Sequence, residues 1–142
     1  MPRFAAPAST PDLQTLHAVI THRYHVMAQY AKSLKRTYLD ECDALRRTAP
    51  GDARALQDVA GWLQGDEVKL RHADRMKLAA VLGKSRALHT VYCMRGELAT
   101  LWERSMVSRE ELVVRLQDWC RRAEASGIRP LVEFSQRLRC YA

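Results

Sequence analysis

The sequence lacks long apolar runs and is poor in the residues that build turns. Its longest apolar stretches, such as Leu78 to Leu82, fall far short of the roughly 20 residues that cross a bilayer. Six glycines, five prolines and two phenylalanines are too few for an all-β domain, in which strands and turns recur every 8–12 residues or so. With 47% hydrophobic and 27% charged residues, the 142-residue chain also does not resemble a disordered tail or a fibre. The composition favours a soluble helical domain.

Sequence signals for secretion, disulfides and zinc are missing as well. The four cysteines are widely spaced, with no C-x-x-C pair, which predicts buried thiols in a reducing compartment. The N-terminal residues contain no apolar core of the about 7–15 residues that a signal peptide needs. We therefore expect a cytoplasmic protein.

Proline and apolar spacing together predict where the fold begins. Residues 1–11 contain three prolines and little to bury, so we expect a flexible Pro-rich leader, followed by a helical bundle domain over residues 12–142. Thr10 is the expected N-cap and Pro11 the first helical residue. Apolar residues at steps of three and four then predict one long helix of about 33 residues, which the Pro50-Gly51 pair ends.

Shorter helices are expected in the rest of the chain. Asp52 is a candidate cap for the second, and a break is expected at Gly83 to Ser85. Gly96 suggests a close helix crossing. Ser108 to Glu111 form a capping box, and Gly127 with Pro130 marks the boundary of the last two helices. The fold class is therefore all-α, a single-domain helical bundle of about six helices with a long first helix.

We find no constellation of residues for catalysis or metal binding. His22 and His25 share a helix face, but His17 points elsewhere, and no H-E-x-x-H or E-x-x-H frame supplies further ligands. Serines and cysteines lie in helical stretches without a Gly-rich loop. We accordingly predict no catalytic, cofactor-binding or metal-binding residue, and we expect the three tryptophans to pack in the core.

The formal charge of +7 points to an anionic partner. Three interpretations stay open for the clustered cations: helix-dipole stabilisation, an anionic membrane surface, or nucleic-acid phosphates. One cluster is Lys69, Arg71, Arg75 and Lys77. The predicted contacts to an anionic surface are Lys32, Lys35, Arg36, Arg121, Arg122, Arg129, Arg137 and Arg139.

Three segments resemble the C-terminal cytosolic region of bacterial membrane-bound, delta-9 type acyl-lipid fatty acid desaturases. They are residues 21–30 (THRYHVMAQY), 85–105, and 116–128 with its AEASGI ending, followed by Phe134, Leu138 and Tyr141. The resemblance implies a non-catalytic accessory domain or truncated fragment from fatty acid biosynthesis. Its implied partners are an anionic membrane surface, a desaturase membrane domain or its electron donor, and its implied position is the inner face of the membrane. The family's di-iron cofactor is held by histidine boxes that this chain lacks, so no cofactor and no activity of its own are expected.

The last of these segments is also similar to the C-terminal helical region of insertion-sequence transposases. There the pattern is Leu-x-x-Trp, an Ala/Ser-Gly stretch and Phe-x-x-x-Leu-Arg, matched here from Leu116 to Arg139. This alternative implies a fragment that binds DNA through its basic surface. The acidic triad of a transposase nuclease core is absent, so this resemblance implies no catalyst either.

Overall fold

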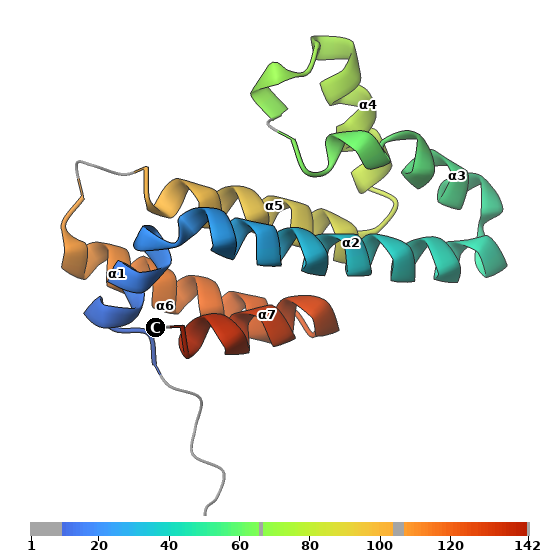
Figure 1. Ribbon diagram of the computed structural model, residues 1–142. Coiled ribbons are helices and arrows are strands. Elements are labelled where there is room, and N and C mark those ends of the chain that lie inside the picture. Colours follow the sequence, from blue (N-terminus) through green and yellow to red (C-terminus); the bar gives the residue numbers. More distant parts are fainter. Residues whose placement is uncertain (1–9, 66, 104–106, 142) are drawn as a thin grey trace, which may run out of the picture. The chain divides into compact units, whose positions relative to one another are not determined.

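The computed structural model describes residues 10–65, 67–103 and 107–141 (Figure 1). These residues form seven α-helices and two short 3-10 helices and contain no strand, which confirms the all-α prediction. The predicted leader, residues 1–11, lies outside the described residues except for Thr10 and Pro11. In chain order the elements are α1 (Leu13–Thr21), α2 (Arg23–Thr48), α3 (Pro50–Asp58), η1 (Ala60–Trp62), η2 (Glu67–Lys69), α4 (His72–Leu82), α5 (Arg86–Leu101), α6 (Arg109–Ala125) and α7 (Arg129–Arg139).

The chain divides into two compact units, which are described separately. Unit 1 consists of Met1–Tyr30 and Met94–Ala142, and unit 2 of Ala31–Cys93. Helices α2 and α5 therefore contribute residues to both units.

The first helix begins after Asp12 rather than after Thr10. Asp12 Oδ1 accepts a hydrogen bond from the backbone N–H of Thr15 at 2.9 Å, and this bond holds the pKa of Asp12 below its ordinary value. Pro11 lies before the helix, and its carbonyl accepts a hydrogen bond from Gln117 Nε2 of α6 at 2.7 Å. The predicted Thr10 cap is wrong because the Asp12 carboxylate takes that role.

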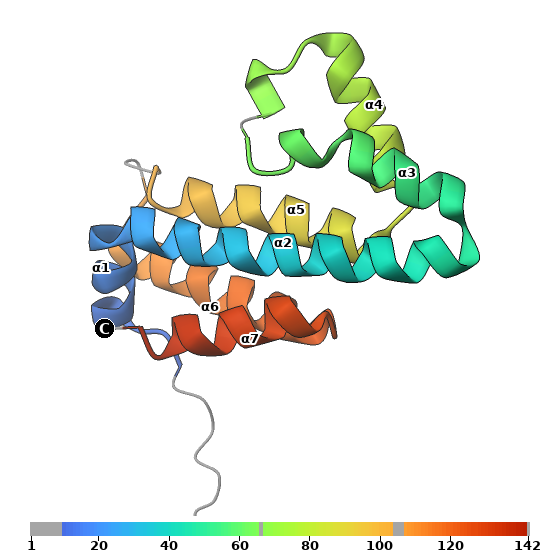
Figure 2. The same ribbon diagram turned by 45° about the vertical axis from the view of Figure 1, so that its right-hand side comes forward.

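The expected long helix is interrupted at His22. This residue adopts φ −106° and ψ 29°, outside the helical region, so α1 and α2 run in different directions (Figures 1 and 2). Arg23 Nη1 donates to the carbonyl of Ile20 at 3.2 Å, which satisfies a carbonyl at the end of α1. The longer part, α2, has 26 residues. Neither α2 nor any other described helix is long and apolar enough to cross a membrane.

Three aromatic rings form the centre of unit 1. The Tyr30 and Phe134 rings meet edge to face at a centroid distance of 4.9 Å, and Trp119 lies 5.9 Å from Phe134 and 6.1 Å from Tyr30. Trp119 Nε1 donates to the carbonyl of Met94 at 2.9 Å, so its one polar atom is satisfied within the core. These contacts join α2, α5, α6 and α7. The predicted core role holds for Trp119, whereas Trp62 and Trp102 are half-buried.

Unit 2 packs α3 against α4 over a core of leucine and valine. Buried side chains include Leu56 in α3, Val59 directly after α3, and Leu78, Val81 and Leu82 in α4. Polar bonds link its ends: Ser85 Oγ donates to Glu41 at 2.7 Å, and Lys84 Nζ lies 3.3 Å from Asp52. The hydroxyl of Tyr92 donates to Glu67 at 3.4 Å, which connects η2 to α5.

The later helix boundaries agree with their sequence signals. Ser85 Oγ accepts from the N–H of Leu88 at 3.2 Å, and Ser108 Oγ accepts from the N–H of Glu111 at 3.1 Å. The Glu111 carboxylate bonds to Arg115 at 3.1 Å and, among the described residues, not to the N–H of Ser108, so only the Ser108 half of the predicted capping box is present. Gly127 has φ +71°, the left-handed conformation expected after a helix C-terminus.

The predictions for Asp52 and Gly96 were wrong, whereas α2 ends before the Pro50-Gly51 pair as predicted. Pro50 is the first residue of α3, not merely the stop of α2, because proline fits the first turn, where its missing N–H needs no partner. Asp52 therefore lies within the first turn and is not the cap. A Cβ placed on Gly96 would meet no atom within 4 Å, so Gly96 marks no close helix crossing.

Burial of the thiols is only partly as expected. Cys42 and Cys120 are buried, whereas Cys93 and Cys140 are exposed. Burial raises the pKa of the Cys120 thiol.

Candidate nucleic-acid interface

The predicted contact residues do not form one cluster. Lys32, Lys35 and Arg36 lie on α2 in unit 2, whereas Arg121, Arg122, Arg129, Arg137 and Arg139 lie on α6 and α7 in unit 1. All are exposed except Arg139. The two groups differ in how far carboxylates neutralise them.

The α2 group retains most of its charge. Residues three and four apart share one helix face, so Lys32, Lys35 and Arg36 project from the same side of α2. Arg36 forms an ion pair with Asp40 at 3.0 Å. Lys32 and Lys35 have no ion pair with any residue that the structure describes.

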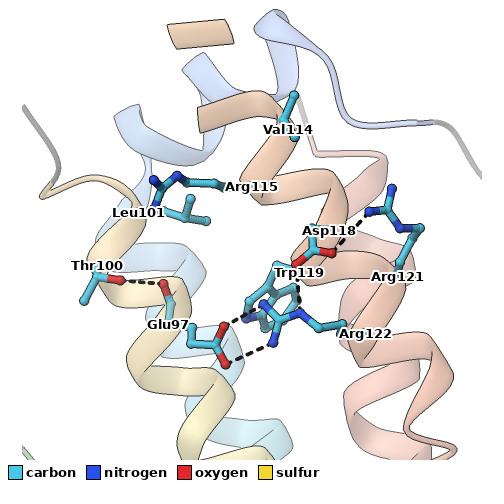
Figure 3. A pocket seen from close by; sticks show the side chains of 9 residues that line it. All are labelled: Glu97, Thr100, Leu101, Val114, Arg115, Asp118, Trp119, Arg121 and Arg122. Carbon is cyan, nitrogen blue, oxygen red and sulfur yellow. Dashed lines mark hydrogen bonds and ion pairs between the residues drawn. The ribbon is translucent and has the colours of Figure 1, made fainter. Parts of the chain in front are cut away.

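Unit 1 contains a groove of about 410 Å³ between α5 and α6, lined by three arginines (Figure 3). Arg122 reaches across it with both terminal nitrogens: Nη2 lies 2.6 Å and Nη1 3.1 Å from the two oxygens of Glu97. Its Nε also donates to Asp118 at 2.8 Å. These bonds raise the pKa of Arg122 and hold the pKa of Asp118 below its ordinary value. Arg122 thus acts as a link between two helices.

The other two arginines of the groove are also paired. Arg121 lies 3.2 Å from Asp118, and Arg115 lies 3.1 Å from Glu111 (Arg121 and its partner are drawn in Figure 3). Because carboxylates accompany every arginine, the groove offers little net positive charge to a phosphate. Its arrangement is better suited to holding α5 against α6 than to binding an anion.

Arg139 is the least accessible predicted contact. Its side chain is 11% exposed, and its Nε donates to Glu124 at 2.6 Å. Glu124 also accepts a hydrogen bond from Ser135 Oγ at 2.6 Å. Burial raises the pKa of Glu124, but the hydrogen bonds from Arg139 and Ser135 outweigh burial and leave this pKa below its ordinary value. Arg139 therefore serves the packing of α7 on α6.

The two remaining α7 arginines are exposed. Arg129 pairs with Glu133 one turn later at 3.3 Å. Arg137 has no ion pair within the described ranges and borders a small groove of about 170 Å³ together with His25, Gln29 and Tyr141. Of the five cations predicted in unit 1, only Arg137 keeps an uncompensated charge.

The histidines of the first helices contact an aromatic ring. The centroids of the His22 and His25 rings lie 6.0 and 6.4 Å from that of Tyr141. No group of three or more histidine, cysteine, aspartate or glutamate side chains in the described part of the chain could hold a metal ion. The absence of a catalytic or cofactor site stays a prediction.

The set of predicted contacts omits a basic segment of unit 2. Lys69, Arg71, Arg75 and Lys77 are not ion-paired with any described residue, although they form an evident cluster in the sequence. The signal that separates them from α6 is the scarcity of nearby acids: residues 69–77 contain a single carboxylate, Asp74, whereas α6 contains four. Counting cations alone does not reveal this difference.

Comparison with known proteins decides between the two resemblances. A family model, DDE_Tnp_ISL3, described as "Transposase", matches residues 13–142. The transposase for insertion sequence element IS1001 of Bordetella parapertussis is 31% identical over an alignment of 127 residues that covers 87% of this chain. The chain spans about 30% of that relative's length. No solved structure matches.

These matches overturn the first resemblance. The desaturase interpretation is wrong, together with the role in fatty acid biosynthesis and the membrane-bound partners that it implied. The expected position at the inner face of the membrane loses its support. The alternative agrees with both matches: the chain belongs to the transposase family.

Proposed function

We propose that this chain is a helical part of an insertion-sequence transposase and that it binds double-stranded DNA through phosphate contacts. The family match over residues 13–142 carries the proposal, because an insertion-sequence transposase acts on DNA. The net charge of +7 has the sign that phosphates require.

The exposed cations of α2 favour contact with the phosphate backbone of DNA over recognition of its bases. The cations on the α2 face are lysine and arginine side chains on a regular helix, suited to phosphates along a groove wall. Lys32 and Lys35 are the predicted contact residues with uncompensated charge in unit 2. We retain them, with Arg36, as contacts to the DNA backbone.

Fluorescence anisotropy of a labelled 30-base-pair duplex of mixed sequence tests this function. We expect binding at 50 mM NaCl, with the logarithm of the association constant falling linearly with the logarithm of salt concentration. Each phosphate contact contributes about −0.9 to this slope. The absence of any binding at 50 mM NaCl would show that the proposed function is wrong.

A further inference from the structure

Residues 69–77 of unit 2 form the described segment richest in uncompensated positive charge. This basic segment leads from η2 into the first turns of α4 and contains Lys69, Arg71, Arg75 and Lys77. Lys69, Arg71 and Lys77 are exposed, and Arg75 is half-buried. None of the four has an ion pair with a residue in the described ranges. By contrast, Arg121, Arg122, Arg129 and Arg139 on α6 and α7 are all paired with carboxylates.

The basic segment is held in place at both ends. Before it, Glu67 accepts a hydrogen bond from Tyr92, and the N–H of Leu70 donates to the carbonyl of Glu67 at 3.1 Å. After it, α4 buries Leu78, Val81 and Leu82 and contacts α3. The cations therefore project from an ordered helix and turn, which limits the entropy lost when they bind a partner.

Two large apolar side chains accompany these cations on the surface. Val68 is 78% and Met76 60% exposed, among the highest values for large apolar residues in the described chain. A DNA groove presents sugars and thymine methyl groups next to phosphates, so isolated apolar side chains among cations suit it. An amphipathic helix that lies in a membrane surface would need a continuous apolar face, whereas the apolar side of α4 is buried in unit 2.

We propose that the basic segment, residues 69–77, is a main contact of this chain with the phosphate backbone of double-stranded DNA. This inference rests on the proposed function and assigns it a site. At about 1.5 Å of rise per residue, Arg71 to Lys77 cover about 9 Å, or two to three phosphates of one strand at about 3.4 Å each. The expected contribution is therefore a few phosphate contacts.

A pair of charge-matched triple variants tests the assignment. Lys69→Gln, Arg71→Gln and Lys77→Gln together remove three exposed cations of the basic segment. Arg47→Gln, Arg54→Gln and Arg86→Gln remove three exposed cations elsewhere in unit 2 that likewise have no ion pair with a described residue. Both sets lower the net charge equally, and thermal unfolding followed by circular dichroism verifies that each variant folds.

Anisotropy with the 30-base-pair duplex then distinguishes the outcomes. We expect the basic-segment variant to bind about 10-fold or more weakly at 100 mM NaCl and to lose about 2 to 3 units of salt slope. The control variant should lose clearly less in both measures. Equal losses of affinity and salt slope in the two variants would overturn the assignment of the basic segment, but not the proposal that the chain binds DNA. No binding by the unaltered chain would overturn the proposed function itself.

Discussion

Among single residues, Gly127 and Gly96 differ in whether the backbone requires a glycine. Gly127 follows α6 with φ +71°, a conformation that a Cβ makes unfavourable, whereas a Cβ at Gly96 in α5 would meet nothing within 4 Å. We expect Gly127→Ala to destabilise the fold by about 1 kcal/mol. Gly96→Ala should stabilise it by about 0.5–1 kcal/mol, because alanine is the better helix former. Urea unfolding measures both, and a stabilising Gly127→Ala would contradict the assigned helix end.

Cysteine reactivity gives a second test at this scale. Cys93 and Cys140 are exposed, whereas Cys42 and Cys120 are buried. We expect two thiols to react rapidly with Ellman's reagent in the folded protein and four in denaturant. The Cys93→Ser, Cys140→Ser double variant should show no rapid reaction when folded. Rapid modification of that variant would place Cys42 or Cys120 at the surface.

At the scale of helices, ion pairs with carboxylates decide which of the predicted cations remain available to bind DNA phosphates. Lys32 and Lys35 on α2 are uncompensated, whereas Arg121 and Arg129 pair with Asp118 and Glu133. We expect Lys32→Gln with Lys35→Gln to weaken DNA binding several-fold and to reduce the salt slope by about 1 to 2. The matched Arg121→Gln, Arg129→Gln variant should have the smaller effect. Anisotropy measures both, and a larger loss from the α6 and α7 pair would reverse this ranking.

The attachment of α7 to α6 should depend on pH. The folded state holds the pKa of Glu124 below its ordinary value through Arg139 and Ser135. A depressed carboxyl pKa adds stability above the unfolded pKa, about 4.3, and this stability is lost as pH falls through the folded pKa. We expect the melting temperature to decrease below about pH 4.5, and less steeply in Glu124→Gln.

Glu110→Gln, in the exposed first turn of α6, is the charge-matched control for this experiment. It should retain the acid sensitivity of the unaltered protein. If Glu124→Gln and the unaltered protein lose stability in parallel between pH 5 and 3, the Glu124 carboxylate does not provide the acid-sensitive contact.

Helix ends follow from the sequence where one local signal dominates. Ser85 and Ser108 act as predicted because their capping bonds reach only three residues along the chain, and Gly127 because its positive φ is a local property. Thr10 and Asp52 were wrongly predicted as caps because each lies next to another adequate helix start, at Asp12 and Pro50 respectively, and local sequence does not rank the two starts. No proline or glycine near His22 predicts that the helix is interrupted there.

Neutralisation of the arginines was harder to predict for a physical reason. The pair of Arg121 with Asp118 is visible as a helical spacing of three. Arg122 meets Glu97 across 25 residues and Arg139 meets Glu124 across 15 residues, so these pairs depend on how helices pack. Sequence clusters therefore overstated the free charge of α6 and α7.

For the whole molecule, the wrong family resemblance has a structural explanation. Its most distinctive segment, AEASGI, is a helix C-terminus: Ala123 is buried, and Ser126 Oγ accepts from the N–H of Ile128 at 3.1 Å. Gly127 supplies the positive φ. Such a segment reports how a helix ends in any helical protein, so it could not distinguish desaturase from transposase.

Amide NMR during a titration with the 30-base-pair duplex tests the central claim most directly, because it reports both binding and location. We predict salt-sensitive shifts concentrated in residues 67–77 and on the Lys32 to Arg36 face of α2, with smaller changes along α6 and α7. Unchanged spectra with excess duplex at 50 mM NaCl, or shifts confined to α6 and α7, would contradict it.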